Sequence, residues 1–184
     1  ELDPRDTTSS QLDALSDAGF TSLSMGVQDF SDAVQDAIRR HQSVAQTRWL
    51  VEHARTTGFD DINIDIVYGL PFQTDTTFAE TLSHVIDLAP DRVALFGYAH
   101  LPAKLPHQKI VERAGRVLDR FAKPGSRLAI AARERRMTRS FQGYVERRAD
   151  TVIGLGVSAI SSTPRMHWQS HPDLAAWEAD IARQ

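Results

Sequence analysis

The first hundred residues alternate between apolar runs and segments with helical spacing. Residues 23–27, 62–68 and 92–98 are rich in β-branched and other apolar side chains, which predicts three strands. The segments between them place apolar residues three and four positions apart, as amphipathic helices do. Strands that alternate with helices indicate βαβ units and a parallel sheet, so the predicted fold class is α/β.

Capping and chain-breaking residues mark the ends of the predicted helices. A short polar side chain before a helix can accept backbone N–H bonds, and glycine or proline favours the helix end. The expected starts are Ser9 or Ser10, Ser31, Ser43, and Thr74 or Asp75, and the expected ends are Gly19, Gly58 and Pro90. Three helix-strand units are too few for a closed eight-stranded barrel. The sheet is therefore either open or part of a barrel.

The pattern becomes less regular after Pro102. The elements expected there are a basic helix over 128–137, an aromatic turn at 141–144, a glycine-rich loop or strand end at 154–160 and a final helix over 174–182. The glycines of the loop match neither GxGxxG nor a P-loop, so the pattern argues against dinucleotide binding. His167 and His171 are four residues apart, but Pro172 favours a loop over a metal-binding helix, and we predict no metal site.

Composition describes an ordinary globular chain of 184 residues, with 41% hydrophobic and 24% charged residues. No apolar run approaches the ~20 residues of a membrane helix, and no secretory signal is evident, so a cytoplasmic location and no membrane partner are expected. There is no cysteine, which excludes disulfides and any cysteine-ligated metal or cluster within this chain.

Charge is unevenly distributed. Residues 104–148 carry 13 Lys or Arg against 4 Asp or Glu, whereas residues 1–103 carry 6 against 16. The basic stretch is either a set of solvated helix faces or a region that attracts an anionic ligand. It has few aromatic side chains for base stacking, so nucleic acid is not an expected partner.

Polar residues at the predicted strand ends are the first candidates for a site, because ligands of parallel α/β folds bind at the carboxyl ends of strands. They are Gln28 and Asp29, then Asp65, and then Tyr98 and His100.

Each candidate also has a purely structural interpretation. Asp65 lies within an apolar strand, where a carboxylate either holds backbone amides or an arginine, or serves a ligand. Gln28 alone is best explained as a turn residue. Arg40 alone is best explained as a cation at a helix C-terminus, although a guanidinium can also grip a carboxylate. No Ser-His-Asp arrangement is evident, so no catalytic residue is assigned.

Five segments together resemble the oxygen-independent coproporphyrinogen III oxidases of the radical S-adenosylmethionine (SAM) superfamily, and they occur in that family's order. They are LSMGVQDF at 23–30, NIDIVYGLP at 63–71, YAHLP at 98–102, FQGY at 141–144 and GVSAIS at 156–161. The related heme-chaperone branch shares the first two segments. The YAHLP and FQGY segments favour the oxidase branch.

This resemblance implies a partial (β/α) barrel with parallel strands inside and helices outside. It implies a 4Fe-4S cluster, two molecules of SAM, and a 5′-deoxyadenosyl radical that starts the decarboxylation of two propionates. The implied reaction turns coproporphyrinogen III into protoporphyrinogen IX in heme biosynthesis and needs an electron donor. A monomer is expected. The cofactor supplies the difficult chemistry, and the protein positions it.

The resemblance also implies a set of SAM-binding residues. They are Glu1, Gln28, Arg40, Asp65, Ala99 of the YAHLP segment, and Ile160 of the GVSAIS segment. Carboxylate, amide and guanidinium groups suit the ammonium, hydroxyls and carboxylate of SAM.

Several family features are missing from these residues. The family's CxxxCxxC cluster segment precedes the position of Glu1, and its C-terminal domain follows that of Gln184. A stretch between Val111 and Leu118 is absent, and Arg120 replaces a family histidine. We therefore expect a fragment with a partial-barrel portion at 1–111 and a family-specific continuation with an internal deletion at 112–184. The alternatives are a non-catalytic heme-binding homologue and a degenerate copy.

The lack of cysteine predicts that the 184 residues alone do not catalyse the reaction. Anaerobic iron–sulfur reconstitution should give no 4Fe-4S absorption, because no thiolate is available to hold the iron. Incubation with coproporphyrinogen III and SAM should give no vinyl products. A cluster spectrum together with vinyl products would contradict this expectation.

Overall fold

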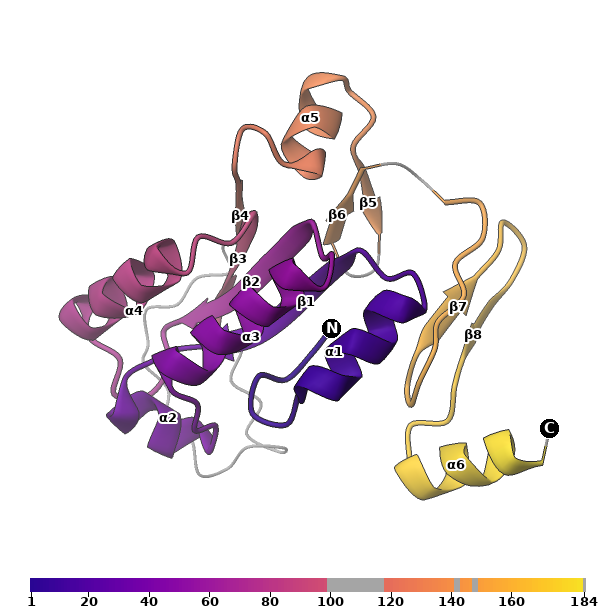
Figure 1. The fold of residues 1–184 in the computed structure, drawn as a ribbon, viewed down its shortest axis with the longest axis horizontal. Helices are drawn as coiled ribbons and strands as arrows, with labels where there is room; N and C mark the ends of the chain where they lie inside the picture. Colours follow the sequence, from indigo (N-terminus) through magenta and orange to yellow (C-terminus); the bar gives the residue numbers. More distant parts are fainter. Residues whose placement is uncertain (99–117, 141–142, 147–148, 184) are drawn as a thin grey trace. The chain divides into compact units, whose positions relative to one another are not determined.

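A computed structural model describes residues 1–98, 118–140, 143–146 and 149–183 of the chain (Figure 1). The chain divides into two compact units, Glu1–Ile130 and Ala131–Gln184, which are described separately. The boundary predicted between residues 111 and 112 lies outside the described residues and stays a prediction.

The first unit is built on a four-stranded sheet in the order β1-β2-β3-β4. Strands β1 (Ser22–Gln28), β2 (Asp61–Tyr68) and β3 (Arg92–Gly97) are parallel, as predicted. Strand β4 (Leu118–Ala122) pairs antiparallel with β3 and was missed, because its five residues, LDRFA, show neither an apolar run nor an alternation of apolar and polar residues. The α/β fold class is confirmed, and the sheet is mixed rather than wholly parallel.

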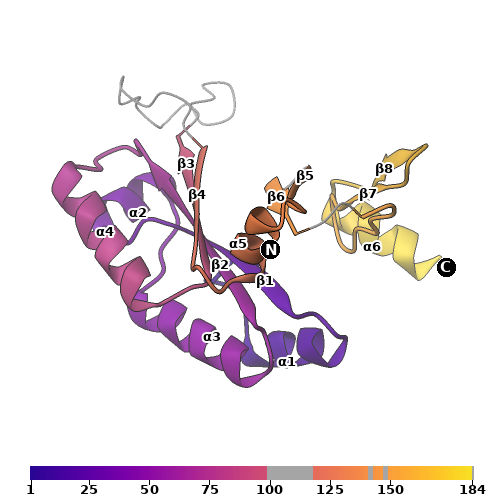
Figure 2. The same ribbon diagram turned by 90° about the horizontal axis from the view of Figure 1, so that it is seen from above.

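Helices cover one face of this sheet. Helices α1 (Ser9–Asp17), α3 (Val44–Thr56) and α4 (Asp75–Asp87) lie on the same side of it, and the short α2 (Asp32–Ile38) follows β1 (Figure 2). The core between them is apolar and fully buried, because helix residues such as Leu12, Leu50 and Val85 pack against alternate strand residues. The strand residues are Leu23, Met25, Ile62, Ile64 and Ile66.

The helix starts follow the capping signals with two differences. Ser43 and Thr74 are N-caps that accept backbone N–H bonds, as predicted. The first helix is capped by Thr8, not by Ser9 or Ser10, since Thr8 and Gln11 form a reciprocal capping box. Ser31 occupies the N-cap of α2 without a side-chain cap bond.

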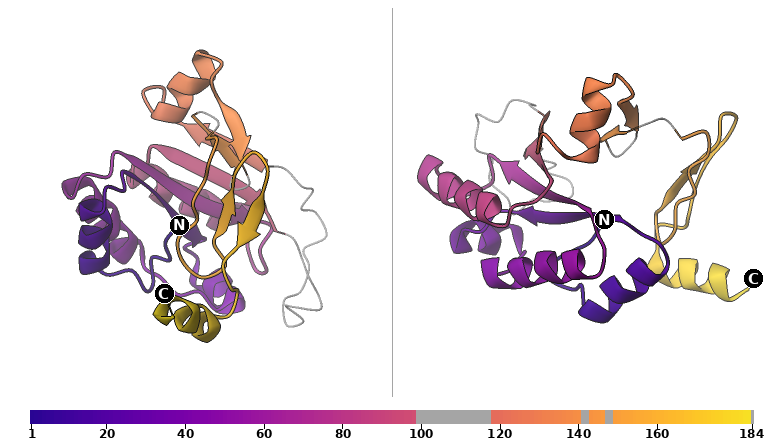
Figure 3. Two further views of the ribbon diagram at one scale, coloured as in Figure 1. Left: turned by 90° about the vertical axis from the view of Figure 1, so that its right-hand side faces the viewer. Right: turned by 45° about the horizontal axis from the view of Figure 1, so that its top comes forward.

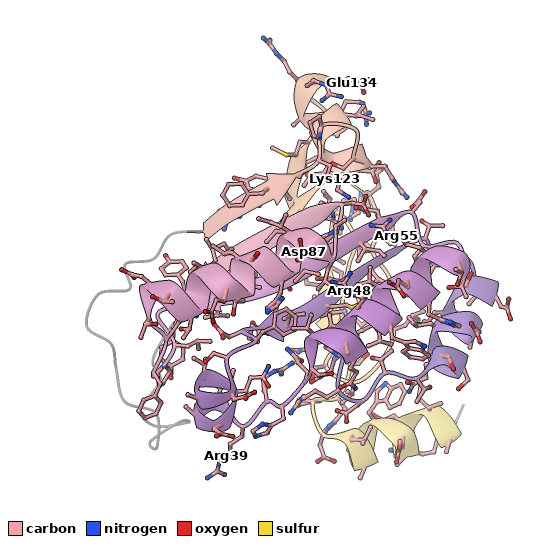
Figure 4. All side chains as sticks on the ribbon, turned by 60° about the vertical axis from the view of Figure 1, so that its left-hand side comes forward. Arg39, Arg48, Arg55, Asp87, Lys123 and Glu134 are labelled. Atoms are coloured by element: carbon pink, nitrogen blue, oxygen red, sulfur yellow. The ribbon has the colours of Figure 1, made fainter. Side chains whose placement is uncertain are left out.

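Basic side chains bind the C-terminal end of α4 (Figure 4). Arg48 donates to the Asp87 carbonyl at 3.3 Å, and Arg55 and Lys123 donate to the Ala89 carbonyl at 2.9 and 2.6 Å. These cations meet carbonyl groups that have no partner within the helix, at the negative end of the helix dipole. These hydrogen bonds join α3 and the residue after β4 to the C-terminal end of α4.

The second unit consists of short elements (Figure 3). Helix α5 (Arg127–Arg133) spans the division between the units and ends before residue 137, the predicted end. Two hairpins follow: β5 (Thr138–Ser140) with β6 (Gly143–Val145), and β7 (Ile160–Ser162) with β8 (His167–Gln169). Helix α6 (Leu174–Ala182) confirms the predicted final helix, with Asp173 as its N-cap. Residues 141–142 of the predicted aromatic turn lie outside the described residues.

No helix in the described part of the chain is long and apolar enough to cross a membrane.

Replacing Ile64 by Ala should destabilise the first unit by roughly 2–5 kcal/mol, because the side chain is fully buried in the core. Urea unfolding followed by circular dichroism would measure this change. Ile86→Ala is the matched control, since Ile86 is 72% exposed on α4 and its replacement should change stability by less than about 0.5 kcal/mol. Equal effects of the two substitutions would contradict the assignment of the core face.

Candidate functional site

The sheet face opposite the helices is polar. Side chains alternate along a strand, so the isoleucines of β2 enter the core while Asp61, Asn63 and Asp65 face the other side. The register aligns Ser22, Ser24 and Gly26 of β1 with these three residues. A row of small and polar groups therefore crosses both strands.

Asp65 is held within this row by hydrogen bonds. Ser24 Oγ donates to Asp65 Oδ2 at 3.2 Å, and Asn63 Nδ2 donates to Asp65 Oδ1 at 2.6 Å and to Ser24 Oγ at 2.8 Å. The neighbouring carboxylate Asp61 instead pairs with Arg92, at 2.9 Å between Oδ1 and Nε. Asp65 is half-buried, whereas Asp61 is buried. The arrangement orients Asp65 as an acceptor.

The N-terminal segment pairs with the outer edge of β1. Leu2 N donates to Ser24 O at 2.7 Å, and Gly26 N donates to Leu2 O at 3.2 Å. Leu2 packs against the core, so its neighbours Glu1 and Asp3 alternate toward the polar face. The structure thus brings Glu1 beside the strand that carries Gln28.

Arg40 reaches back from the end of α2 to the same strand. Its Nη2 lies 3.0 Å from Asp3 Oδ2 and donates to the Gly26 carbonyl at 3.0 Å. The preceding Arg39 points away from the sheet (Figure 4). These contacts place the Arg40 guanidinium against β1 and the N-terminal segment, so the simple helix-dipole interpretation does not describe it. Within the described residues, the buried Arg40 Nε has no hydrogen-bond partner.

Asp3 is an ion-pair centre that was not predicted from the sequence. The side-chain hydrogen bond from Arg5 lowers the pKa of Asp3, and the positive charges of Arg40 and Arg5 act in the same direction against the effect of burial. The same hydrogen bond raises the pKa of Arg5. Asp3 therefore stays ionised and fixes Arg40 against Gly26.

Gly26 lies where the side chains of Gln28 and Arg40 approach β1. A Cβ at Gly26 would lie 2.9 Å from Gln28 Nε2 and 3.5 Å from Arg40 Nη2, so a side chain here would displace the end of the Gln28 side chain. The register slips between Gly26 and Gln28, which is a bulge. The Gln28 amide therefore lies against Gly26, directly across from Asp65.

The predicted residues fall into three groups. Gln28, Arg40 and Asp65 lie around Gly26 in the first unit, and Glu1 precedes Leu2, which pairs with the edge of β1. Ile160 is the first residue of β7 in the second unit. Ala99 and His100 lie outside the described residues. Tyr98 directly follows β3, where its N–H donates to the Tyr68 carbonyl at 2.9 Å and burial raises the pKa of its hydroxyl.

Sequence reasoning missed Ser24 and Asn63, although both are polar residues at alternate positions of apolar strands, a pattern that indicates a polar face. His167 is exposed on β8 and does not share a helix with His171. Among the described residues, no three His, Asp or Glu side chains are placed to hold a metal ion.

Comparison with known proteins agrees with this geometry. Residues 2–85 match the family described as the radical SAM superfamily. A solved structure described as coproporphyrinogen III oxidase from Escherichia coli, a radical SAM enzyme, superposes with a TM-score of 0.80 and 37% identity, covering 100% of this chain and 48% of the other. A radical SAM methyltransferase from Kitasatospora setae shares the fold at 16% identity, with a TM-score of 0.51 over 58% of this chain and 20% of the other.

The chain therefore contains a radical SAM domain over residues 2–85. The chain is also similar to the oxygen-independent coproporphyrinogen III oxidases of Escherichia coli strain K12 and Salmonella typhimurium. The identities are 37% and 41%, over 100% and 98% of this chain and 46% and 45% of those proteins. The chain thus spans about half the length of the curated relatives it matches.

The lowered pKa of Asp3 predicts a pH-dependent contribution to stability. Because the pKa is depressed on folding, the contribution is complete above the unfolded value of about 3.9 and is lost as the pH falls through the folded value. An NMR titration of the Asp3 carboxyl should show the shift. Arg5→Leu should move this pKa toward its ordinary value, whereas Arg39→Leu should not, since Arg5 bonds only the main chain of Arg39. A shift of equal size in both variants would contradict the pairing.

Proposed function

We propose that these residues are the SAM-binding part of a radical SAM oxidase that acts on coproporphyrinogen III. The observation that carries the proposal is the convergence of Gln28, Arg40 and Asp65 around Gly26 on the polar sheet face. A carboxylate, an amide and a guanidinium with an unsatisfied Nε offer the acceptors and donors that an amino acid joined to a nucleoside requires. Glu1 adds a carboxylate beside them.

The residues present fit SAM better than they fit the cluster. The chain has no cysteine, so none of its side chains is the usual thiolate ligand of a 4Fe-4S cluster. When bound together, cluster and SAM supply the radical chemistry of the superfamily. The described side chains bind and orient the ligand: Arg40 donates, Asp65 accepts, and Gln28 can do both.

The substrate proposal rests on the curated relatives and on the five family segments. The described cations of the basic stretch give it little support, because several already have partners. Arg127 pairs with Asp60 at 2.8 Å, Arg136 pairs with Glu134, and Lys123 binds the Ala89 carbonyl. They fit the solvated-face interpretation, so propionate recognition is assigned to other groups.

The full proposal includes the remaining expectations from the family. It comprises two molecules of SAM, with Ala99 and Ile160 among their contacts, and an electron donor. A monomer in the cytoplasm that acts in heme biosynthesis, without nucleic acid or membrane partners, completes it.

Binding of SAM to the 184-residue chain, measured by isothermal titration calorimetry, tests the proposal. Arg40→Gln and Asp65→Asn should each weaken binding by about tenfold or more, the loss expected for one charge-assisted hydrogen bond. Arg39→Gln is the matched control and should bind like the parent chain, because Arg39 points away from the site. Tight heme binding that SAM does not influence would instead support a chaperone-like homologue.

A further inference from the structure

Strand β1 ends in a strained turn centred on Gln28. The Gln28 backbone has a φ of 69°, in the left-handed region that favours glycine. Asp29 N donates to the Val27 carbonyl at 2.9 Å, which closes a three-residue γ-turn around Gln28. A conformation of this kind persists only where surrounding groups hold it. The turn therefore needs an anchor.

Asp29 provides the first part of that anchor. Its side chain is completely buried and accepts three hydrogen bonds: from Ser31 N at 2.7 Å, Thr81 Oγ1 at 3.1 Å and Gln73 Nε2 at 2.6 Å. All three partners donate, which suits an ionised carboxylate. The bond to Ser31 N satisfies a main-chain donor at the start of α2, where Ser31 itself makes no side-chain cap.

Gln73 connects this anchor to the end of the neighbouring strand. Its Oε1 accepts from Gly69 N at 2.6 Å, and its Nε2 donates to the Val67 carbonyl at 3.0 Å as well as to Asp29. The end of β1 and the end of β2 are thus joined through one half-buried amide. Those two strands carry Gln28 and Asp65.

Two further glutamines hold the carbonyl groups on either side of Gln28. Gln35 Nε2 donates to the Asp29 carbonyl at 2.9 Å, and Gln42 Nε2 donates to the Val27 carbonyl. Gln42 N in turn donates to Gln35 Oε1 at 3.1 Å, and both side chains are buried. Arg40 lies between them in sequence, and its N–H donates to the Gln35 carbonyl at 3.0 Å. One network therefore fixes both Gln28 and Arg40.

We propose that Asp29 is a positioning residue and that, with Gln35, Gln42 and Gln73, it forms a clamp that presents Gln28 and Arg40 to the ligand. Asp29, Gln35 and Gln42 are buried and Gln73 is half-buried, and all four act through the Gln28 turn rather than through ligand contact. The inference rests on the proposed function for the identity of the ligand, SAM. The clamp itself is defined by the contacts above.

Asp29→Asn tests the clamp with little change in shape. The new amide places a donor against Gln73 Nε2, or against Ser31 N and Thr81 Oγ1, so at least one bond is replaced by a donor–donor contact. Hydrogen exchange followed by NMR should show lost protection of the residue 29 amide, which closes the turn. The Kd for SAM should rise about tenfold or more.

Asp91→Asn is the matched control at the opposite end of the sheet. The Asp91 carboxylate also accepts a main-chain bond, from Ile62 N at 3.0 Å, and a side-chain bond, from Arg55 Nη2 at 3.1 Å. Its replacement should lower the unfolding midpoint but leave the residue 29 exchange rate and the Kd for SAM unchanged. Equal changes of the Kd in both variants would show a general loss of stability and would overturn the clamp.

An exchange of the two bonded groups supplies a rescue. Asp29→Asn combined with Gln73→Glu restores a donor–acceptor pair between these positions and keeps an acceptor for Gly69 N, but it removes the bond to the Val67 carbonyl, so only part of the SAM affinity should return. Thr81→Val keeps the shape of the side chain but removes the bond to Asp29 and the bond from Phe30 N, so it should give a loss in the same direction. It replaces Asp29→Asn if that variant does not fold.

The outcomes separate this inference from the proposed function. If the parent chain binds no SAM, the proposed function fails, but the hydrogen-exchange rate of the residue 29 amide still tests the clamp. A faster rate in Asp29→Asn and not in Asp91→Asn supports the clamp, and an unchanged rate in Asp29→Asn overturns it. If the parent binds SAM and a folded Asp29→Asn variant binds it equally well, the clamp is wrong and the proposed function stands.

Discussion

The two-residue period of strand β2 is the constraint on which the first unit depends. Its isoleucines lie in the apolar core beneath the helices, and its Asp and Asn residues lie on the opposite face. A shift of one residue in register would bury three polar side chains against Leu12 and Leu50 and expose the isoleucines. The same alternation that stabilises the sheet therefore also sets which side of it is polar.

The polar face is stable because its side chains form hydrogen bonds and an ion pair with one another. Asn63 serves both Ser24 and Asp65, and Arg92 neutralises the buried Asp61. At the ends of β1 and β2, side-chain amides donate hydrogen bonds to main-chain carbonyls, as water does at an exposed loop. The donors are Gln35, Gln42 and Gln73. These hydrogen bonds allow Gln28 to keep its unfavourable left-handed backbone conformation.

The sequence predicted the elements whose local pattern of residues favours only one structure. The isoleucine-rich strand β2, the caps Ser43 and Thr74, and the final helix over 174–182 were all predictable from periodicity and capping. Strand β4 was not, because five residues of mixed character form a strand only when β3 offers an edge. The grouping of Glu1, Gln28, Arg40 and Asp65 came from family resemblance, since residues far apart in sequence meet only through the tertiary fold. The roles of Asp3 and Asp29 depend on long-range partners such as Arg40 and Thr81, which no local pattern identifies.

The antiparallel direction of β4 affects how far the connection between β3 and β4 can vary in length. The parallel strands β1, β2 and β3 all end at the edge of the sheet where Gln28 lies. Strand β4 begins at that edge and ends at the opposite edge. The chain thus leaves the sheet after Tyr98 and rejoins it at Leu118 on the same side. The number of residues that connect them can therefore change while every strand keeps its neighbour and its register. The sheet is a fixed frame, because the pairing of β3 with β4 does not depend on the length of that connection.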